Sequence, residues 1–256
     1  MEFELKTSPF TDPIEIDENL FVSAEDVHKH ISPLLTSSRR NKIQQVVAAR
    51  CFHIPIVLES IYDRGNISAV MRSGEALGFC HYHIIETQER FKEANRVTQG
   101  ADKWIESWRW KKTSDCVKYL KDSGYKILTT SLEATKTISE IDWTQPSAMV
   151  LGNEKEGVSR EMIEASDETF IIPMCGFVQS FNISVAGALC LYQIRQTRLS
   201  RGGSHADLSE SEKKVLEAIY ALRTQDSGEK LLKELATRGE IAAQFKSSDT
   251  DKISVR

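Results

Sequence analysis

The spacing of hydrophobic residues along the chain changes repeatedly between the pattern of a buried strand and that of an amphipathic helix. Short apolar runs predict strands over residues 54–59, 81–85, 103–110, 125–130, 148–151 and 169–172. Apolar residues at helical spacing predict helices over residues 38–53, 66–77, 114–123, 159–165, 181–198, 209–224 and 229–238. Because strands and helices alternate through the middle of the chain, the pattern predicts an α/β fold with a parallel sheet.

Composition divides the chain into three predicted parts. These are an acidic N-terminal extension (1–34), the α/β domain (35–205), and a C-terminal helical extension with a polar tail (206–256). Residues 1–26 have a net charge of −7, so the other 230 residues carry +3 in a chain of net charge −4. The larger part is therefore mildly basic, which suits a protein that binds a polyanion. Three roles remain open for the acidic segment: shielding a basic surface, binding a partner, or disorder.

Several classes of protein are not expected from this sequence. It has no run of 18 apolar residues and no secretory signal, so neither a membrane span nor export is predicted. Its five cysteines lack CxxC spacing and indicate reduced thiols in a cytoplasmic protein. GxGxxG, P-loop and HExxH motifs are absent, so no dinucleotide site, P-loop or metal site is predicted. His81 and His83 share one face of a predicted strand and are interpreted as structural.

Three separated segments carry the candidate chemistry. They are NISAVMRSGEALG at 66–78, MVLGNEKEGVS at 149–159 and IIPMCGFVQSFNISVA at 171–186. Each leads from a strand or a glycine-containing bend into a helix, where Asn66 and Asn182 stand at positions suited to N-caps. Glycine at 152, 157 and 176 allows the backbone to approach a ligand closely. Taken singly, the segments are equally typical of ordinary strand-to-helix loops.

In order, spacing and flanking residues, the three segments together resemble the motifs of the SpoU/TrmH family of SPOUT methyltransferases, over about residues 35–225. The resemblance implies a parallel-sheet α/β knot with short helical N- and C-terminal extensions, and makes 35–205 the SPOUT methyltransferase domain. It also implies a homodimer that transfers a methyl group from S-adenosylmethionine to a ribose 2′-hydroxyl of RNA, without a metal.

The resemblance assigns site residues one by one. The expected catalytic-site residues are Arg72, Asn66, Glu154, Ser180 and Asn182. The residues expected to bind S-adenosylmethionine, largely through the backbone, are Thr130, Leu151, Gly152, Gly157, Ile172, Met174 and Phe181. Phe181 departs from the leucine expected at that position, so the pocket wall there differs in shape.

Elementary chemistry restricts the roles of two of these residues. The pKa of arginine lies above about 12, so its side chain stays protonated at neutral pH and is a poor base. Arg72 is therefore expected either to stabilise the developing alkoxide or to take the proton with the help of an RNA phosphate. A carboxylate against the sulfonium would stabilise the ground state more than the transition state. Glu154 is accordingly expected to organise its loop and not to touch the sulfur.

Basic clusters indicate where RNA would bind. The expected RNA contacts are Arg39, Arg40, Arg50, Arg195, Arg198 and Arg201. A further basic cluster at 103–112 contains three tryptophans, which are more typical of a core or a dimer interface. The short helical extensions resemble those of the family members that methylate a guanosine in the D-loop of tRNA, so the resemblance implies this substrate. A ribosomal RNA 2′-O-methyltransferase and a non-catalytic RNA-binding relative are the alternatives.

Overall fold

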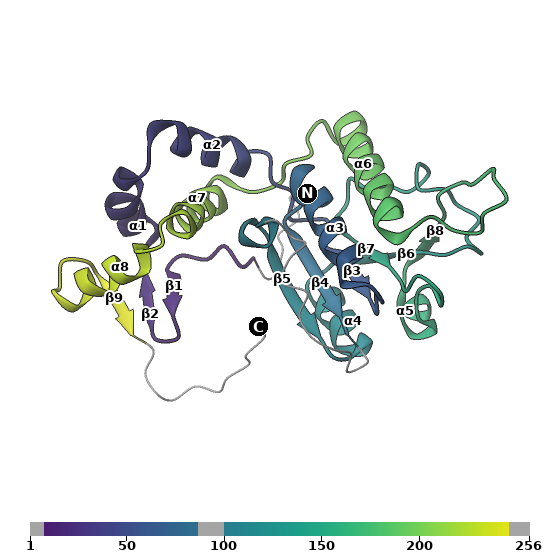
Figure 1. Cartoon of the computed structure of the whole chain (residues 1–256), viewed down its shortest axis with the longest axis horizontal. Coiled ribbons are helices and arrows are strands. Elements are labelled where there is room, and N and C mark those ends of the chain that lie inside the picture. The colour runs from purple at the N-terminus through teal and green to yellow at the C-terminus, as the bar shows by residue number, and fades with distance from the viewer. Residues whose placement is uncertain (1–7, 87–99, 246–256) are drawn as a thin grey trace. The chain divides into compact units, whose positions relative to one another are not determined.

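The computed structural model describes residues 8–86 and 100–245, which form two compact units (Figure 1). The sheet unit is Cys51–Asp207, and the helical unit combines Ser8–Arg50 with 208–245. The second predicted boundary, after residue 205, lies two residues from the observed one. The first, after residue 34, lies one helix too early, because α2 (Ser37–Val47) packs against α7 (Glu210–Thr224). The last eleven residues of the expected polar tail lie outside the described residues.

All six predicted strands are present in the sheet unit and pair in parallel, which confirms the predicted α/β class. The strand order is β5-β4-β3-β7-β6-β8. The strands are β3 (Ile56–Glu59), β4 (His81–Ile85), β5 (Glu106–Trp110), β6 (Lys126–Thr130), β7 (Ser147–Leu151) and β8 (Glu168–Phe170). The central strands β3 and β7 are neighbours, so the loops that follow them leave the same edge of the sheet side by side.

Alternating apolar residues on the strands build two cores, one on each face of the sheet. Ile56 and Leu58 share a core with α3 (Arg64–Ala76) and α6 (Ile183–Gly202). Val57 shares the other core with α4 (Thr113–Asp122) and α5 (Arg160–Ala165). The sheet therefore lies between two helical layers, as Figure 1 shows. A short 3-10 helix, η2 (Ala101–Trp104), precedes β5.

Helix ends in the sheet unit agree with the sequence at α6 but not at the start of α3. The side chain of Asn182 caps α6, as predicted, and Gly203, at φ 75°, ends the helix four residues beyond the predicted end at residue 198. Asn66 does not cap α3. That helix begins two residues earlier, because Asp63 accepts a hydrogen bond from the Gly65 backbone N–H at 2.7 Å. The side chain of Asn66 is consequently available for other contacts.

The helical unit contains five elements that the hydrophobic pattern does not predict. They are β1 (Ile14–Asp17), β2 (Leu20–Val22), α1 (Ala24–Ile31), η1 (Ser32–Leu34) and β9 (Ala243–Phe245). Strand β2 pairs antiparallel with both β1 and β9, and α8 (Gly228–Thr237) precedes β9. The acidic segment is thus folded from residue 8 onward, which is inconsistent with disorder there.

Acidic side chains of this segment stabilise its local structure. Asp12 accepts a hydrogen bond from the Ala24 backbone N–H at 2.9 Å, at the first residue of α1. Asp17 accepts two backbone hydrogen bonds in the β1–β2 turn and pairs with Lys233 at 2.9 Å. Part of the negative charge therefore contributes to folding.

Candidate active site

The loops after β3 and β7 meet around the carboxylate of Glu154. Its Oε2 accepts a hydrogen bond from the Tyr62 backbone N–H at 2.8 Å. Its Oε1 accepts from the side-chain amide of Asn66 at 2.9 Å and from the Asp63 backbone N–H at 3.4 Å. Burial raises the pKa of Glu154, but the hydrogen bonds from Tyr62, Asn66 and Asp63 lower it, and the net pKa lies below the usual value. The carboxylate is therefore ionised at neutral pH and holds the two loops together.

The third candidate segment reaches the same place through Asn182. Its side-chain amide lies 3.5 Å from Oδ1 of Asn66, while its own Oδ1 accepts a hydrogen bond from the Ser184 backbone N–H at 2.9 Å. Four of the five expected catalytic residues are thereby located: Asn66, Glu154 and Asn182 form one network, and Ser180 is exposed just before the N-cap. The three segments, widely separated in sequence, converge at the carboxyl end of the sheet.

Arg72 is the expected catalytic residue that does not join this network. It lies on α3 on the side opposite the buried residues Ile67 and Val70, and it is exposed. Within residues 8–86 and 100–245, no hydrogen bond or ion pair joins its guanidinium to Asn66 or Glu154. The side chain is thus directed toward solvent, where a substrate can reach it.

A second set of contacts, not expected from the sequence, fixes both ends of the β7–α5 loop. The Asn153 amide donates to the Ser60 carbonyl at 2.7 Å, and Ser60 itself has a positive φ of 52°. Glu59 is 1% exposed and accepts hydrogen bonds from Ser159 Oγ at 2.7 Å and Thr113 Oγ1 at 2.7 Å. In the sequence, this role of Glu59 is indicated only by its position, because it is a carboxylate at the end of an otherwise apolar strand.

Glycine is required at two positions of the same loop. A Cβ on Gly152 would lie 2.3 Å from the carbonyl carbon of Gly157 and 2.3 Å from the Val158 nitrogen. The close approach arises because Asn153 and Gly157 exchange two backbone hydrogen bonds, of 2.8 and 2.9 Å. Gly157 has a φ of 71°, which side-chain-bearing residues rarely adopt. The loop is therefore a tight bend with little freedom to change shape.

The side chains expected to line a cofactor lie at the carboxyl ends of three adjacent strands. Thr130 ends β6 and donates from Oγ1 to the Val150 carbonyl at 3.0 Å. Leu151 ends β7 and is fully buried, and Ile172 follows β8 and packs half-buried against the core. Met174 is half-buried and Phe181 is 37% exposed. Apolar side chains beside loops that carry backbone donors and acceptors suit a nucleoside, which has a flat apolar face and a polar edge.

The prediction of an RNA contact is wrong for two of the arginines, Arg50 and Arg198, because both are buried. Arg50 is 1% exposed, and its Nε donates to the Tyr220 hydroxyl at 3.1 Å inside the helical unit. Arg198 is 5% exposed, pairs with Asp207 at 2.9 Å and donates to the Trp143 carbonyl at 3.1 Å. In the sequence each looked like part of a basic surface cluster. In the structure, the guanidinium of Arg50 binds Tyr220 within the helical unit, and that of Arg198 binds Asp207 within the sheet unit.

Replacing Arg198 by methionine is expected to lower the free energy of unfolding by about 3–5 kcal/mol, because Asp207 then remains buried without its partner. Urea unfolding followed by circular dichroism measures this difference. Arg201→Met is the matched control, since Arg201 is exposed and donates a hydrogen bond to the Ser139 carbonyl at the surface. Equal stability of the two variants would contradict the structural role of Arg198.

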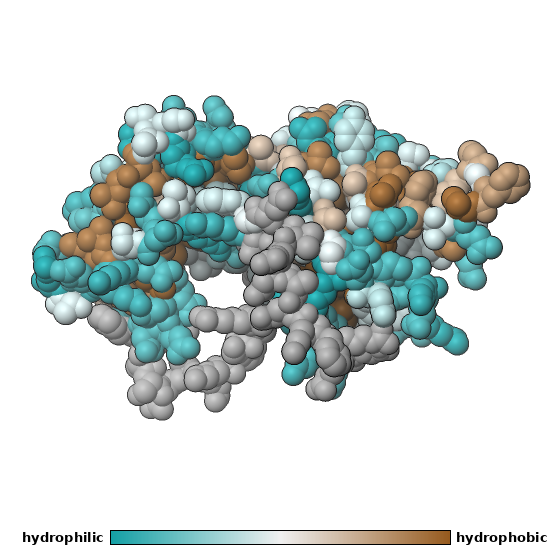
Figure 2. Space-filling view, viewed as in Figure 1, coloured by the Kyte–Doolittle hydropathy of each residue, from teal (hydrophilic) through white to brown (hydrophobic). Residues whose placement is uncertain are grey.

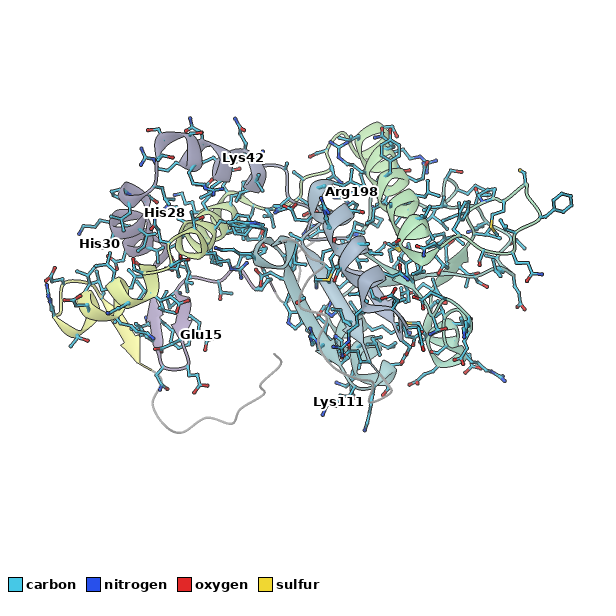
Figure 3. All side chains as sticks on the ribbon, in the orientation of Figure 1. Glu15, His28, His30, Lys42, Lys111 and Arg198 are labelled. Carbon is cyan, nitrogen blue, oxygen red and sulfur yellow. The ribbon has the colours of Figure 1, made fainter. Side chains whose placement is uncertain are left out.

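Other basic residues remain accessible. Arg39 is exposed on α2, Arg195 is half-buried and Arg201 is exposed on α6. The half-buried Arg40 donates to the carbonyls of Ser32 and Leu35. Lys42 and Lys111 extend away from the ribbon, whereas Arg198 lies among packed side chains (Figure 3).

The histidine pair and the tryptophans of β5 form a buried polar chain. Trp110 Nε1 donates to His83 Nδ1 at 2.9 Å, so the proton of His83 lies on Nε2, which is 2.8 Å from His81 Nε2. His81 Nδ1 in turn donates to the Phe52 carbonyl at 3.1 Å. Burial lowers the pKa of His81 to about 3 and that of His83 well below its ordinary value, so both rings are neutral. The structural interpretation of both histidines is confirmed, and Trp108 stacks on His83 in the same cluster.

Two features are absent from the part of the chain that the structure describes. No group of three or more histidine, cysteine or acidic side chains in the described part of the chain is arranged to hold a metal ion. Among the helices of residues 8–86 and 100–245, none is both long enough and apolar enough to cross a membrane.

Fold and site together define a parallel α/β protein with three loops that converge at the carboxyl edge of its sheet. Residues 53–192 match the model of the SpoU rRNA Methylase family, and the chain belongs to this family. Among solved structures it is similar to the TrmH/SpoU tRNA modifying enzyme of A. aeolicus, with a TM-score of 0.64 and 28% identity over 72% of this chain and 95% of that one.

Curated relatives extend the likeness over most of their own length. A tRNA (guanosine(18)-2′-O)-methyltransferase of Borreliella burgdorferi is 34% identical over 77% of this chain and 91% of the relative. The enzyme of the same name from Thermus thermophilus is 32% identical over 65% of this chain and 87% of the relative. A 23S rRNA (guanosine-2′-O-)-methyltransferase RlmB of Vibrio parahaemolyticus is 30% identical over 62% of this chain and 66% of the relative.

Proposed function

We propose that the protein is an S-adenosylmethionine-dependent RNA ribose 2′-O-methyltransferase that acts on a guanosine of tRNA. The observation that mainly supports this chemistry is the convergence of the three segments on Asn66, Glu154 and Asn182. The choice of tRNA is supported by coverage, because the chain aligns with 87–91% of two tRNA-modifying relatives and with 66% of the ribosomal RNA relative. A tRNA substrate also supports the cytoplasm as its site of action.

S-adenosylmethionine, when bound, supplies an electrophilic methyl group on a positively charged sulfur. Thr130, Leu151 and Ile172 would hold its nucleoside part at the ends of three strands, with Met174 and Phe181 beside them. Gly152 and Gly157 would keep the loop backbone close to the ligand. The side chain of Glu154 already accepts hydrogen bonds from both neighbouring loop segments, which supports an organising role away from the sulfur.

Arg72 is the residue proposed to act on the RNA. Its exposure on α3 leaves the guanidinium accessible to a ribose 2′-hydroxyl and the adjacent phosphate. A fixed positive charge beside the hydroxyl favours loss of its proton by stabilising the alkoxide that develops during attack. Alignment of the hydroxyl with the methyl group is the main contribution to such a displacement, since good alignment lowers the activation barrier by roughly 7–11 kcal/mol.

The path of the chain after β8 supports a knotted topology. Ile171 exchanges backbone hydrogen bonds of 2.9 and 3.0 Å with residues 136 and 138 of the long loop after β6. The chain then returns to the centre of the sheet, where a Cβ on Gly187 would lie 2.9 Å from Val70 of α3 and 3.2 Å from Leu151 of β7. We infer that the last segment passes through the preceding loop, which would form the knot that the family resemblance implies.

A homodimer is proposed from the outer face of α6. Val185, Leu189 and Tyr192 follow one another at helical spacing and are 48%, 42% and 56% exposed. Phe177 and Val178, on the preceding loop, are also strongly exposed, and Figure 2 shows hydrophobic side chains gathered over this region, on the right of the view. An apolar stripe of this kind is typical of a protein interface. Because the stripe leads directly into Asn182, a second copy bound there would border the active site.

Changing Leu189 and Tyr192 to glutamate is expected to convert a dimer into a monomer, because charges placed in a self-facing apolar interface are left without partners. Sedimentation equilibrium gives the mass directly, with Ile163→Glu on α5 as an exposed control. A wild-type protein that sediments at the mass of one chain would exclude the dimer.

RNA contacts are proposed for the accessible arginines Arg39, Arg40, Arg195 and Arg201. Arg40 would keep its backbone hydrogen bonds while presenting part of its guanidinium to a phosphate. Binding through such residues is expected to weaken steeply with salt, since each phosphate contact releases condensed counterions.

The proposed function is tested by incubating the purified protein with S-adenosylmethionine and, in separate reactions, unmodified tRNA and ribosomal RNA. Nuclease digestion and mass spectrometry then locate any 2′-O-methylated nucleoside. Methylguanosine in the D-loop of tRNA is the expected product. Methylation of ribosomal RNA alone would retain the chemistry and overturn the substrate, and cofactor binding without any product would favour a non-catalytic RNA-binding protein.

A further inference from the structure

We propose that Tyr62, with Lys155 beside it, forms a platform on which the base of the nucleotide to be methylated stacks. The inference rests on the proposed function and adds a residue that selects and positions the substrate. Tyr62 is 64% exposed, although it lies in the loop that links β3 to α3 at the centre of the active site.

The backbone of Tyr62 is held rigidly against the catalytic network. Its N–H donates to Glu154 Oε2 at 2.8 Å, and Oε1 of the same carboxylate accepts from the Asn66 amide at 2.9 Å. One carboxylate therefore separates the Tyr62 backbone from Asn66. The hydrogen bond uses the backbone only, so a change of the side chain does not remove it.

Lys155 adds a positive charge to this ring. Its Nζ lies 5.8 Å from the centroid of the Tyr62 ring, within the range of a cation–π contact. Its backbone N–H donates to Asn153 Oδ1 at 2.8 Å, so the same tight bend that carries Glu154 also positions Lys155. The nearby carboxylate of Asp63 is already engaged by the Gly65 N–H at 2.7 Å. The pair thus offers a flat aromatic surface beside an ammonium group.

This combination matches the chemistry of an unstacked nucleotide. An enzyme that reacts at one ribose of an RNA loop gains access when the nucleotide leaves its stack, and an aromatic side chain replaces the lost stacking. The ammonium of Lys155 would meet the adjacent phosphate. Any nucleobase has a flat face, so the platform supplies affinity and position for the target nucleotide, while base identity is read elsewhere.

Substitution of the side chain tests the platform without disturbing the backbone hydrogen bond. Tyr62→Leu is expected to raise KM for an unmodified tRNA transcript about ten-fold, the size of one lost base–aromatic stack, and to leave the Kd for S-adenosylmethionine unchanged. Tyr62→Phe is expected to recover most of the loss, because the ring is restored without the hydroxyl. Ile163→Ala on α5 removes an exposed apolar side chain elsewhere in the sheet unit and serves as the matched control.

A fluorescent base separates stacking from a general loss of affinity. A tRNA transcript with 2-aminopurine at the methylated position is expected to be quenched on saturating wild-type protein, and less quenched on Tyr62→Leu. Equal KM and equal quenching for the two proteins would overturn the platform while leaving the methyltransferase intact. A wild-type protein that methylates only ribosomal RNA would overturn the proposed tRNA substrate. The KM and the quenching of wild type and Tyr62→Leu would then be compared on ribosomal RNA, where equal values would overturn the platform.

Discussion

Replacing Arg72 by lysine is expected to lower kcat for RNA 2′-O-methylation by about 10²- to 10³-fold, the usual loss when one donor to a developing oxyanion is removed. Lysine keeps the charge but lacks the planar fork with which arginine binds a hydroxyl and a phosphate together. The side chain is exposed and lies outside the Asn66–Glu154 network, so cofactor affinity and stability should not change. Single-turnover methylation of tRNA measures the chemical step directly.

Arg72→Ala and Arg160→Lys complete the design of this experiment. Alanine should be at least as damaging as lysine, and the conservative change at Arg160, exposed on α5, should leave the single-turnover rate near that of the wild type. Near-normal turnover of Arg72→Lys would show that a positive charge alone suffices. A pH dependence that follows a group other than Arg72 would assign proton removal to that group.

Replacing Gly152 by alanine is expected to weaken binding of S-adenosylmethionine by about 10- to 100-fold. The new methyl group would meet the backbone of Gly157 and Val158 at 2.3 Å, and backbone atoms cannot move aside without opening the bend. Overpacking of this kind costs about 1–3 kcal/mol, which corresponds to that loss of affinity when the displaced loop is the binding site.

Isothermal titration calorimetry with the cofactor measures the effect, and circular dichroism verifies that the fold is retained. Gly202→Ala is the matched control, because its added Cβ would meet Thr144 only at an ordinary contact distance of 3.5 Å. Unchanged affinity in Gly152→Ala would mean that the bend is not part of the cofactor site.

The sheet unit could be predicted from the sequence because its signals are local. Each buried strand is a run of apolar residues, and the glycines at 78 and 203 adopt positive φ at or near the ends of their helices. Strand order and the partnership of β3 with β7 depend on residues about ninety positions apart. The motif resemblance implied that the loops after these two strands share one site, but neither it nor the hydrophobic pattern predicted the strand order.

The helical unit could not be predicted because its contacts join distant parts of the chain. Strands β1, β2 and β9 have three or four residues each, too few to show a clear period. β2 pairs with β9, more than two hundred residues away. The sequence alone also does not distinguish acidic residues that accept backbone hydrogen bonds, as Asp12 and Asp17 do, from those of a solvated charged segment.

In the candidate site, the sequence predicted the identity of the residues better than their contacts. Asn66 looked like a helix cap, but Asp63 takes that role and leaves the Asn66 amide to bind Glu154. Arg50 and Arg198 looked like surface charges, because nothing local marks the Tyr220 hydroxyl and the Asp207 carboxylate that bind them. Contacts of this kind require the fold.

The pairing of β2 with β9 has a consequence for how the chain can change over time. Deleting the segment after α8 would leave the edge of β2 without its partner, and deleting the first two strands would leave β9 unpaired in turn. Residues 14–22 and 243–245 therefore belong to one folding module, although the sheet unit lies between them in the sequence. A descendant is expected to keep both segments or lose both, and an insertion is better tolerated between the units than within either segment.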